Sequence, residues 1–237
     1  MHRNRPVHLN NYSHKRNIHM KGMKLLAAGI LFTAAVQAQT TKSNGVSFGI
    51  RAGVNFQNIN GRSFSDNKLE NKLVPRLQAG VTADVPLADD FYLQPGLLYS
   101  GKGTKFKGSN DVLNISYLDV PVTFLYKPVL GKGRMMLGVG PYVGFALNGK
   151  VTQEDGDKST VKFKNTITAS EAISDYYYRR MDAGANLLFG YEMSSRLSLQ
   201  LNAQLGLQKI NPVIEGVSND NTAYRNTGFG LSLGYHF

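Results

Sequence analysis

The chain has 237 residues, of which 42% are hydrophobic and 18% charged, which excludes both a disordered chain and one built of long apolar helices. It has no cysteine, so disulfide bonds and thiolate metal sites are excluded as well. The formal charge of +11 does not indicate nucleic-acid binding, because residues 1–38 hold six bases and no acid; the remainder has 21 bases against 16 acids, a net +5.

Residues 20–38 have the pattern of a secretory signal peptide. Two lysines precede an uncharged apolar run at 25–36, which is too short to span a bilayer, and small residues around Ala38 suit cleavage after it. A short buried helix is the alternative interpretation of this run. The predicted organisation is a probable non-native upstream extension at 1–19, a signal peptide at 20–38, a short N-terminal segment at 39–45 and one domain at 46–237.

After residue 45, apolar and polar residues alternate with a period of two, the spacing of a β-strand and not of a helix. The clearest run is 196–208, where leucines occupy one face and Ser, Gln, Asn and Gly the other. Each such run is long enough to cross a bilayer as a tilted strand. We predict eight strands, at 46–57, 75–86, 91–103, 112–127, 133–148, 181–192, 196–208 and 228–237.

The connections between these strands alternate in length. Long polar loops are predicted at 58–74, 104–111, 149–179 and 209–223, and short turns at 87–90, 128–132 and 193–195. This asymmetry is typical of an outer-membrane barrel with both termini in the periplasm, and an even strand number lets the sheet close without an exposed edge. The predicted fold is therefore all-β, an eight-stranded antiparallel up-and-down transmembrane β-barrel.

The character of the two strand faces favours a membrane barrel over a soluble, lipocalin-like carrier, whose apolar face would point inward. One face is nearly free of charge and carries aromatic residues near the strand ends, as lipid and its interfaces require. The other face is rich in glycine and small polar residues, which suits a narrow lumen, and its charges of both signs need partners there. This predicted lumen charge network consists of Arg51, Arg76, Asp84, Lys102, Asp119, Asp182 and Glu192.

The sequence offers little for catalysis. His236 is the one histidine after residue 38, and we expect it to be a polar residue facing inward near the periplasmic rim. Asp119, Asp182 and Glu192 could be paired catalytic carboxylates, but ion pairs with lumen bases explain them more simply. We therefore predict no catalytic residue, no metal site and no cofactor. A lumen closed by about eight strands is filled by side chains, so we expect no diffusive pore.

Two loop segments carry residues suited to contacts. GKGTKFKG at 101–108 is not a phosphate-binding loop between strand and helix; it is either a patch for lipopolysaccharide phosphates or a solvated hairpin. The loop at 149–179 runs into a cluster of Tyr and Arg, types favoured at interaction surfaces. This cluster either contacts an envelope or extracellular protein or extends the barrel wall. Its residues are Tyr176, Tyr177, Tyr178, Arg179 and Arg180.

The order and spacing of several segments resemble the PorT-like outer membrane protein β-barrel family, the "porin family" proteins of Bacteroidota. The segments are GIRAGVNFQNI (49–59), VPLADDFYLQPGLLYSGKGTKF (85–106), ISYLDVPVTFLYKP (115–128), GVGPYVGFALNGK (138–150) and GFGLSLGYHF (228–237). The resemblance implies an outer-membrane barrel. It also implies that the barrel-assembly machinery reads Phe237, with Tyr235 and Leu233 in support. One class of the family is implicated in type IX secretion.

Together these features predict an exported, non-enzymatic outer-membrane protein with a structural or interaction role. The alternatives are an accessory component of a secretion system, a small-solute channel and a lipid-modifying outer-membrane enzyme. The expected partners are outer-membrane lipid, lipopolysaccharide, the barrel-assembly machinery and an envelope or extracellular protein, but not nucleic acid.

Overall fold

The alternating segments form eight long antiparallel strands in the computed structural model, which describes residues 45–64, 66–217 and 220–237. The predicted extension, the signal peptide and residues 39–44 lie outside the described residues. Short elements occupy the connections. The long strands are β1 (Ser47–Arg62), β2 (Val74–Ala88), β3 (Phe91–Lys105), β4 (Val112–Tyr126), β6 (Gly133–Thr152), β11 (Met181–Glu192), β12 (Leu197–Gly206) and β14 (Ala223–His236).

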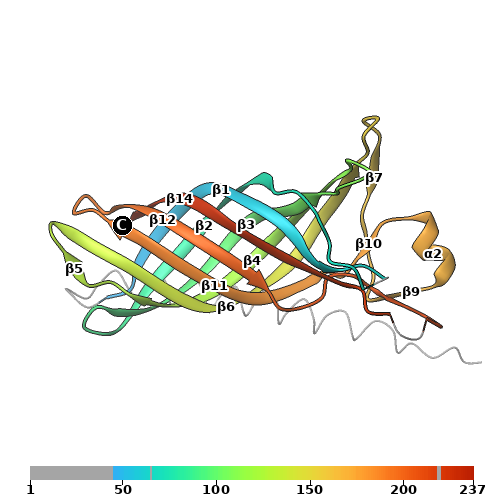
Figure 1. Cartoon of the computed structure of the whole chain (residues 1–237). Helices are drawn as coiled ribbons and strands as arrows, with labels where there is room; N and C mark the ends of the chain where they lie inside the picture. The colour runs from blue at the N-terminus through green and yellow to red at the C-terminus, as the bar shows by residue number, and fades with distance from the viewer. Residues whose placement is uncertain (1–44, 65, 218–219) are drawn as a thin grey trace, which may run out of the picture. The chain divides into compact units, whose positions relative to one another are not determined.

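These strands close into a barrel. Each pairs with its neighbour along the chain, the last strand β14 pairs with the first strand β1, and every long pairing is antiparallel. The long loops gather at the end of the barrel opposite the C-terminus (Figure 1). The predicted eight-stranded antiparallel fold is confirmed.

The barrel wall is apolar outside and polar inside. Leu77, Leu201 and Leu233 are 70%, 51% and 57% exposed, whereas Lys102 and Asp119 are fully buried. A soluble carrier would show the reverse arrangement, so the lipocalin-like alternative is wrong for this chain. The outer face is the kind of surface that lipid covers.

Close approach of the strands depends on inward-facing glycines. A Cβ atom added at Gly53 would lie 2.2 Å from the Leu231 carbonyl oxygen, and one added at Gly140 would lie 1.9 Å from that of Val122. Real Cβ atoms essentially never come this near a carbonyl oxygen. The glycine-rich inner face therefore permits the tight curvature of a narrow barrel.

The main departures from the predicted elements lie at the loop end. β1, β6 and β14 each extend several residues beyond their predicted bounds. The predicted loop at 149–179 is largely folded, and so is part of the next loop. The short elements are β5 (Val129–Leu130), β7 (Lys158–Thr160), β8 (Lys162–Phe163), β9 (Thr166–Ile167), α2 (Ala169–Ser174), β10 (Tyr177–Tyr178) and β13 (Val213–Ile214).

The small elements of the loops support one another. β8 and β10 form a parallel pair, as do β9 and β13, which belong to different loops. The helix α2 begins with a capping box between Thr168 and Glu171. Among the described residues, no helix has the length and hydropathy of a membrane span.

Candidate functional site

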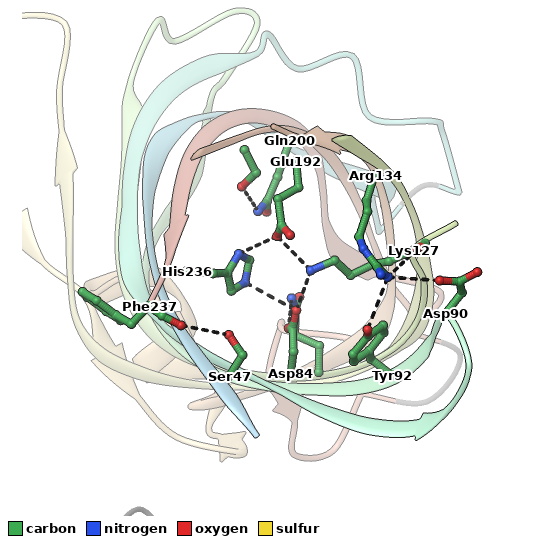
Figure 2. Close-up of polar contacts among 12 residues, drawn as sticks. Ser47, Asp84, Asp90, Tyr92, Lys127, Arg134, Glu192, Gln200, His236 and Phe237 are labelled. Carbon is green, nitrogen blue, oxygen red and sulfur yellow. Dashed lines mark hydrogen bonds and ion pairs between the residues drawn. The ribbon is translucent and has the colours of Figure 1, made fainter. Parts of the chain in front are cut away.

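A ring of four charged or titratable side chains lies inside the barrel at its C-terminal end. Asp84 comes from β2, Lys127 directly follows β4, Glu192 ends β11 and His236 ends β14. All four point into the interior (Figure 2). Because every second side chain of a strand faces the lumen, residues from four separate regions of the barrel wall meet at this end of the barrel.

The contacts of the ring join each acid to both bases. Lys127 Nζ lies 2.9 Å from Asp84 Oδ2 and 2.8 Å from Glu192 Oε2. His236 Nδ1 lies 2.7 Å from Glu192 Oε2, and its Nε2 lies 3.5 Å from Asp84 Oδ2. The imidazole thus lies between the two carboxylates and within 4 Å of both, while neither of its nitrogens forms a hydrogen bond to another described residue.

Neighbouring side chains hold this ring in place. Gln94 donates to the second Asp84 oxygen at 2.7 Å. Arg134 pairs with Asp90 at 3.0 Å and also donates to the Lys127 carbonyl oxygen at 3.1 Å (Figure 2). The Lys127 ammonium lies 5.4 Å from the centre of the Tyr92 ring. The ring is therefore fixed from three sides by polar and aromatic contacts.

Asp84, Glu192 and His236 also form a group that by distance could hold a metal ion, since one ligand atom of each lies within 4.8 Å of the others. The Lys127 ammonium, however, already contacts Asp84 Oδ2 and Glu192 Oε2, the two oxygens that also lie nearest to His236. A metal ion would have to displace this cation. The residues present therefore fit an internal ion-pair ring better than a metal site.

A second charge cluster lies deeper in the barrel toward the loop end. Lys102 Nζ lies 3.0 Å from both Asp119 Oδ2 and Asp182 Oδ2, and all three side chains are fully buried. The rings of Tyr117 and Tyr142 face the ammonium at 4.9 and 4.4 Å from their centres. Asn226 and Gln204 add hydrogen bonds to Asp182 and Asp119 at 3.0 and 3.3 Å.

The structure thus divides the predicted charge network between two clusters. Arg51 is buried and donates to Gln200 at 3.5 Å, and Arg76 donates to the carbonyl oxygen of Leu113 at 3.2 Å. Neither arginine forms an ion pair within the part of the chain that the structure describes. The expectation that both would pair with lumen acids is therefore wrong, because these guanidinium groups reach amide and carbonyl oxygens instead.

Lys127 and His236 complete the first cluster, and sequence reasoning did not place them in it. Lys127 lies two residues after the inward-facing Leu125, and every second residue of β4 faces the lumen. Extending this alternation past the end of the strand would have predicted that Lys127 faces inward. His236 was expected to face inward, and its side chain is buried as expected. Its acidic partners depend on the register between strands, which the sequence pattern does not reveal.

An apolar cap closes the loop end of the lumen above the Lys102 cluster. Barrel residues such as Leu113 and Ile115 pack there against loop residues Val161, Tyr178 and Ile210, all at most 5% exposed. We call these five residues the apolar cap. Charges and apolar layers therefore fill the lumen along its length.

The five residues of the predicted Tyr and Arg cluster, 176–180, lie in different environments in the structure. Tyr178 belongs to the apolar cap, so it is a packing residue and not an exposed contact. Tyr176 and Tyr177 are half-buried and line a pocket between the loops. Arg179 bonds the Ile210 carbonyl oxygen through its backbone, and exposed Arg180 lies over Phe163 at 4.8 Å.

The lysine-rich segment 101–108 does not form one surface patch. Lys102 is the buried cation of the deeper cluster and cannot reach an external phosphate. Lys107 is exposed and pairs with Glu70. The interpretation of this segment as a lipopolysaccharide patch is therefore wrong for Lys102.

The three residues of the predicted assembly signal lie on the outside of the barrel, two of them on β14 and Phe237 directly after it. Leu233, Tyr235 and Phe237 are all exposed, and the rings of Tyr235 and Phe237 meet edge to face at 5.5 Å between centres. The Phe237 amide donates to the Phe48 carbonyl oxygen at 2.8 Å, which ties the chain end to β1. This placement leaves all three side chains accessible from the lipid side.

The chain is similar to solved bacterial proteins over most of its length. Ail of Yersinia pestis, solved with the heparin analogue sucrose octasulfate, is 10% identical, with 81% of this chain and 99% of that one covered and a TM-score of 0.41. OprG of Pseudomonas aeruginosa is 13% identical, with 81% and 95% covered and a TM-score of 0.41. No curated protein matches the chain.

A family profile matches residues 37–211, which is 175 of the 237 residues. The chain belongs to the family described as the outer membrane protein beta-barrel domain.

Proposed function

We propose that this protein is a closed, non-enzymatic outer-membrane barrel that displays its folded loops outside the cell as a binding surface. The observation that carries the proposal is the apolar cap over the buried Lys102 cluster. Water and ions would have to cross both an apolar layer and a set of fully buried ion pairs. That arrangement supports an interaction role rather than solute conduction.

The finer features of the proposal rest on sequence. The signal-peptide pattern and the short turns at the C-terminal end support export, with both termini in the periplasm. Motif order supports the PorT-like branch of the family. Outer-membrane lipid, lipopolysaccharide and the barrel-assembly machinery are the partners that such a barrel would meet, and a secretion-system role remains a more specific form of the same proposal.

Conductance in a planar bilayer tests the proposal. Purified, refolded full-length barrel should give no steady current under conditions in which a larger porin conducts. The double variant Tyr178→Ala/Val161→Ala removes two cap side chains and should at most produce brief openings, because the Lys102 cluster still fills the lumen. A steady current through the unchanged protein would contradict the closed-lumen proposal and favour the solute-channel alternative.

A further inference from the structure

We propose that the pocket between the four long loops binds a neutral or amino saccharide. This inference rests on the proposed function, in which the loops face the outside of the cell. The pocket has a volume of about 440 Å³, within the range of small-molecule sites. Each of these four loops contributes, for example through Phe64, Phe106, Tyr176 and Pro212.

The walls of this pocket are held by internal contacts. The parallel pair β9–β13 joins two of the loops behind it. Asn211, in the wall, accepts a hydrogen bond from the Tyr224 amide at 2.9 Å and donates to the Thr222 carbonyl oxygen at 3.2 Å. Asp175 accepts from Lys162 at 2.6 Å. A pocket fixed in this way needs little reordering when it binds a ligand.

Aromatic residues are the largest group in the lining. Six of the 24 Phe and Tyr residues of the chain line it: Phe64, Phe106, Tyr176, Tyr177, Tyr178 and Tyr224. An aromatic face carries partial negative charge and attracts the weakly positive C–H groups on the faces of a sugar ring. Several rings around one cavity therefore suit a saccharide, which presents such faces together with hydroxyl groups.

The polar groups narrow the ligand class. Asp175 and Asp220 bring two carboxylates to the lining, where they can accept hydrogen bonds from sugar hydroxyls or an ammonium. No Lys, Arg or His is among the described residues that line the pocket. Phosphate or sulfate groups would therefore face two carboxylates, and the base beside them, Lys162, already pairs with Asp175.

Two lysines lie beside the Tyr177 ring of the pocket, and both pair with acids. Lys162 and Lys164 lie 5.9 and 5.7 Å from the centre of the Tyr177 ring. Lys162 pairs with Asp175 and Lys164 with Glu171. Their charges are thus balanced locally, and the pocket does not become an anion site through them.

Titration of the refolded full chain in detergent micelles tests the inference. The probes are N,N′-diacetylchitobiose, cellobiose and glucosamine, with a sulfated disaccharide as the anionic comparison, read by saturation-transfer NMR and calorimetry. At least one of the three uncharged or cationic probes should bind, and the sulfated one should not. Tyr177→Ala should weaken binding roughly 2- to 10-fold, the range of one aromatic contact.

Asp175→Asn should also weaken the binding of glucosamine, the amino-sugar probe. Tyr126→Ala removes an aromatic residue at the opposite end of the barrel and should leave the binding of all probes unchanged. All variants must show the gel mobility shift of a folded barrel before they are compared. Equal weakening by Tyr126→Ala, or tighter binding of the sulfated probe, would overturn the inference.

Two sources can supply such a saccharide, and a second titration separates them. Dephosphorylated lipopolysaccharide core oligosaccharide represents the cell's own surface, and a lipid-free glycan of the probe class represents another cell. Binding of either supports the pocket assignment and identifies its source. If none of the saccharides binds at about 10 mM to a folded protein that is also non-conducting, the saccharide inference fails while the proposed closed barrel stands.

Discussion

Lys102 shows how single charges are accommodated in this lumen. Its ammonium is fully buried, yet two carboxylates and two tyrosine rings surround it. Removing the cation leaves Asp119 and Asp182 buried with like charges and no base between them. A buried ion pair adds little net stability, but breaking one by removing a partner is strongly unfavourable.

We therefore expect Lys102→Met to destabilise the barrel by about 3–5 kcal/mol. Denaturant unfolding in micelles measures this loss. Lys107→Met, which breaks the exposed pair with Glu70, is the matched control and should cost about 0–1 kcal/mol. Adding Asp119→Asn and Asp182→Asn to Lys102→Met should recover much of the loss. Equal costs for the two lysine variants would refute this account of the deeper cluster.

His236 contributes to the stability of the charged ring at the C-terminal end of the barrel. It lies between Asp84 and Glu192, the two carboxylates that Lys127 also contacts. His236→Leu removes a polar neighbour from both buried carboxylates and should cost about 1–3 kcal/mol, the range for leaving a buried polar group without a partner, in the same unfolding assay. His236→Leu combined with Glu192→Gln should cost less than His236→Leu alone, because a neutral amide tolerates the apolar neighbour better; a larger cost would argue against a role of His236 beside Glu192.

At this scale the sequence predicted which residues carry charge into the lumen but not how they pair. Alternation places Asp84, Asp119 and Lys102 on the inner face, because each strand has a period of two. Pairing across the lumen depends on strand register and tilt, and a bulge between Ser116 and Tyr117 shifts the register of β4 against β6. Arg51 and Arg76 were therefore assigned to ion pairs that they do not form.

Among the elements, α2 depends on its cap. Hydrogen bonds from Lys164 and from the Thr168 backbone hold the pKa of the Glu171 carboxyl below its ordinary value of 4.5. A carboxylate with a lowered pKa in the folded state stabilises that state above the unfolded value, and this contribution is lost as the pH falls through the folded value. The cap of α2 should therefore weaken below about pH 4.5.

Amide exchange measures this weakening. The protection factor of the Ala172 amide, which donates to the Thr168 carbonyl oxygen, should fall between about pH 6 and pH 3, on either side of the ordinary glutamate value. Glu171→Gln keeps a capping side chain that does not titrate and should show no such fall. The same decrease in both proteins would show that the Glu171 carboxylate is not its cause.

The C-terminal end of the chain carries the predicted assembly signal. Leu233, Tyr235 and Phe237 lie outside, where they contribute nothing to the lumen, so their predicted role is recognition during assembly. Phe237→Ala should lower the amount of protein assembled in the outer membrane several-fold while leaving refolding of purified protein in micelles unchanged. Phe229→Ala, on the same face of β14, is the control. A matching loss for both variants would point to general wall packing instead.

The strands could be predicted far better than the loops. The inner and outer faces of 196–208 differ so clearly that the strand and its orientation follow directly from the pattern. The loop at 149–179 has no sustained period, and its short elements are stabilised by contacts with another loop, such as β9 with β13. Long-range contacts of that kind leave no local signal, so Tyr178 gave no indication that it would be buried in the cap.

At the scale of the whole barrel, the central claim is that the apolar wall faces lipid and the lumen is closed. The chain contains no tryptophan, so single tryptophans introduced on the outside report their surroundings without interference. Leu201 lies on the wall of β12 and is 51% exposed, and Val213 lies in a loop and is 49% exposed. The two positions are therefore matched in exposure but differ in their predicted distance from lipid.

Quenching by brominated phospholipids in reconstituted vesicles is the most direct measurement. Leu201→Trp should be strongly quenched, and Val213→Trp should fluoresce as it does in unbrominated lipid. Equal, weak quenching of both, with the protein remaining in the aqueous fraction, would contradict the assignment of this wall to the membrane.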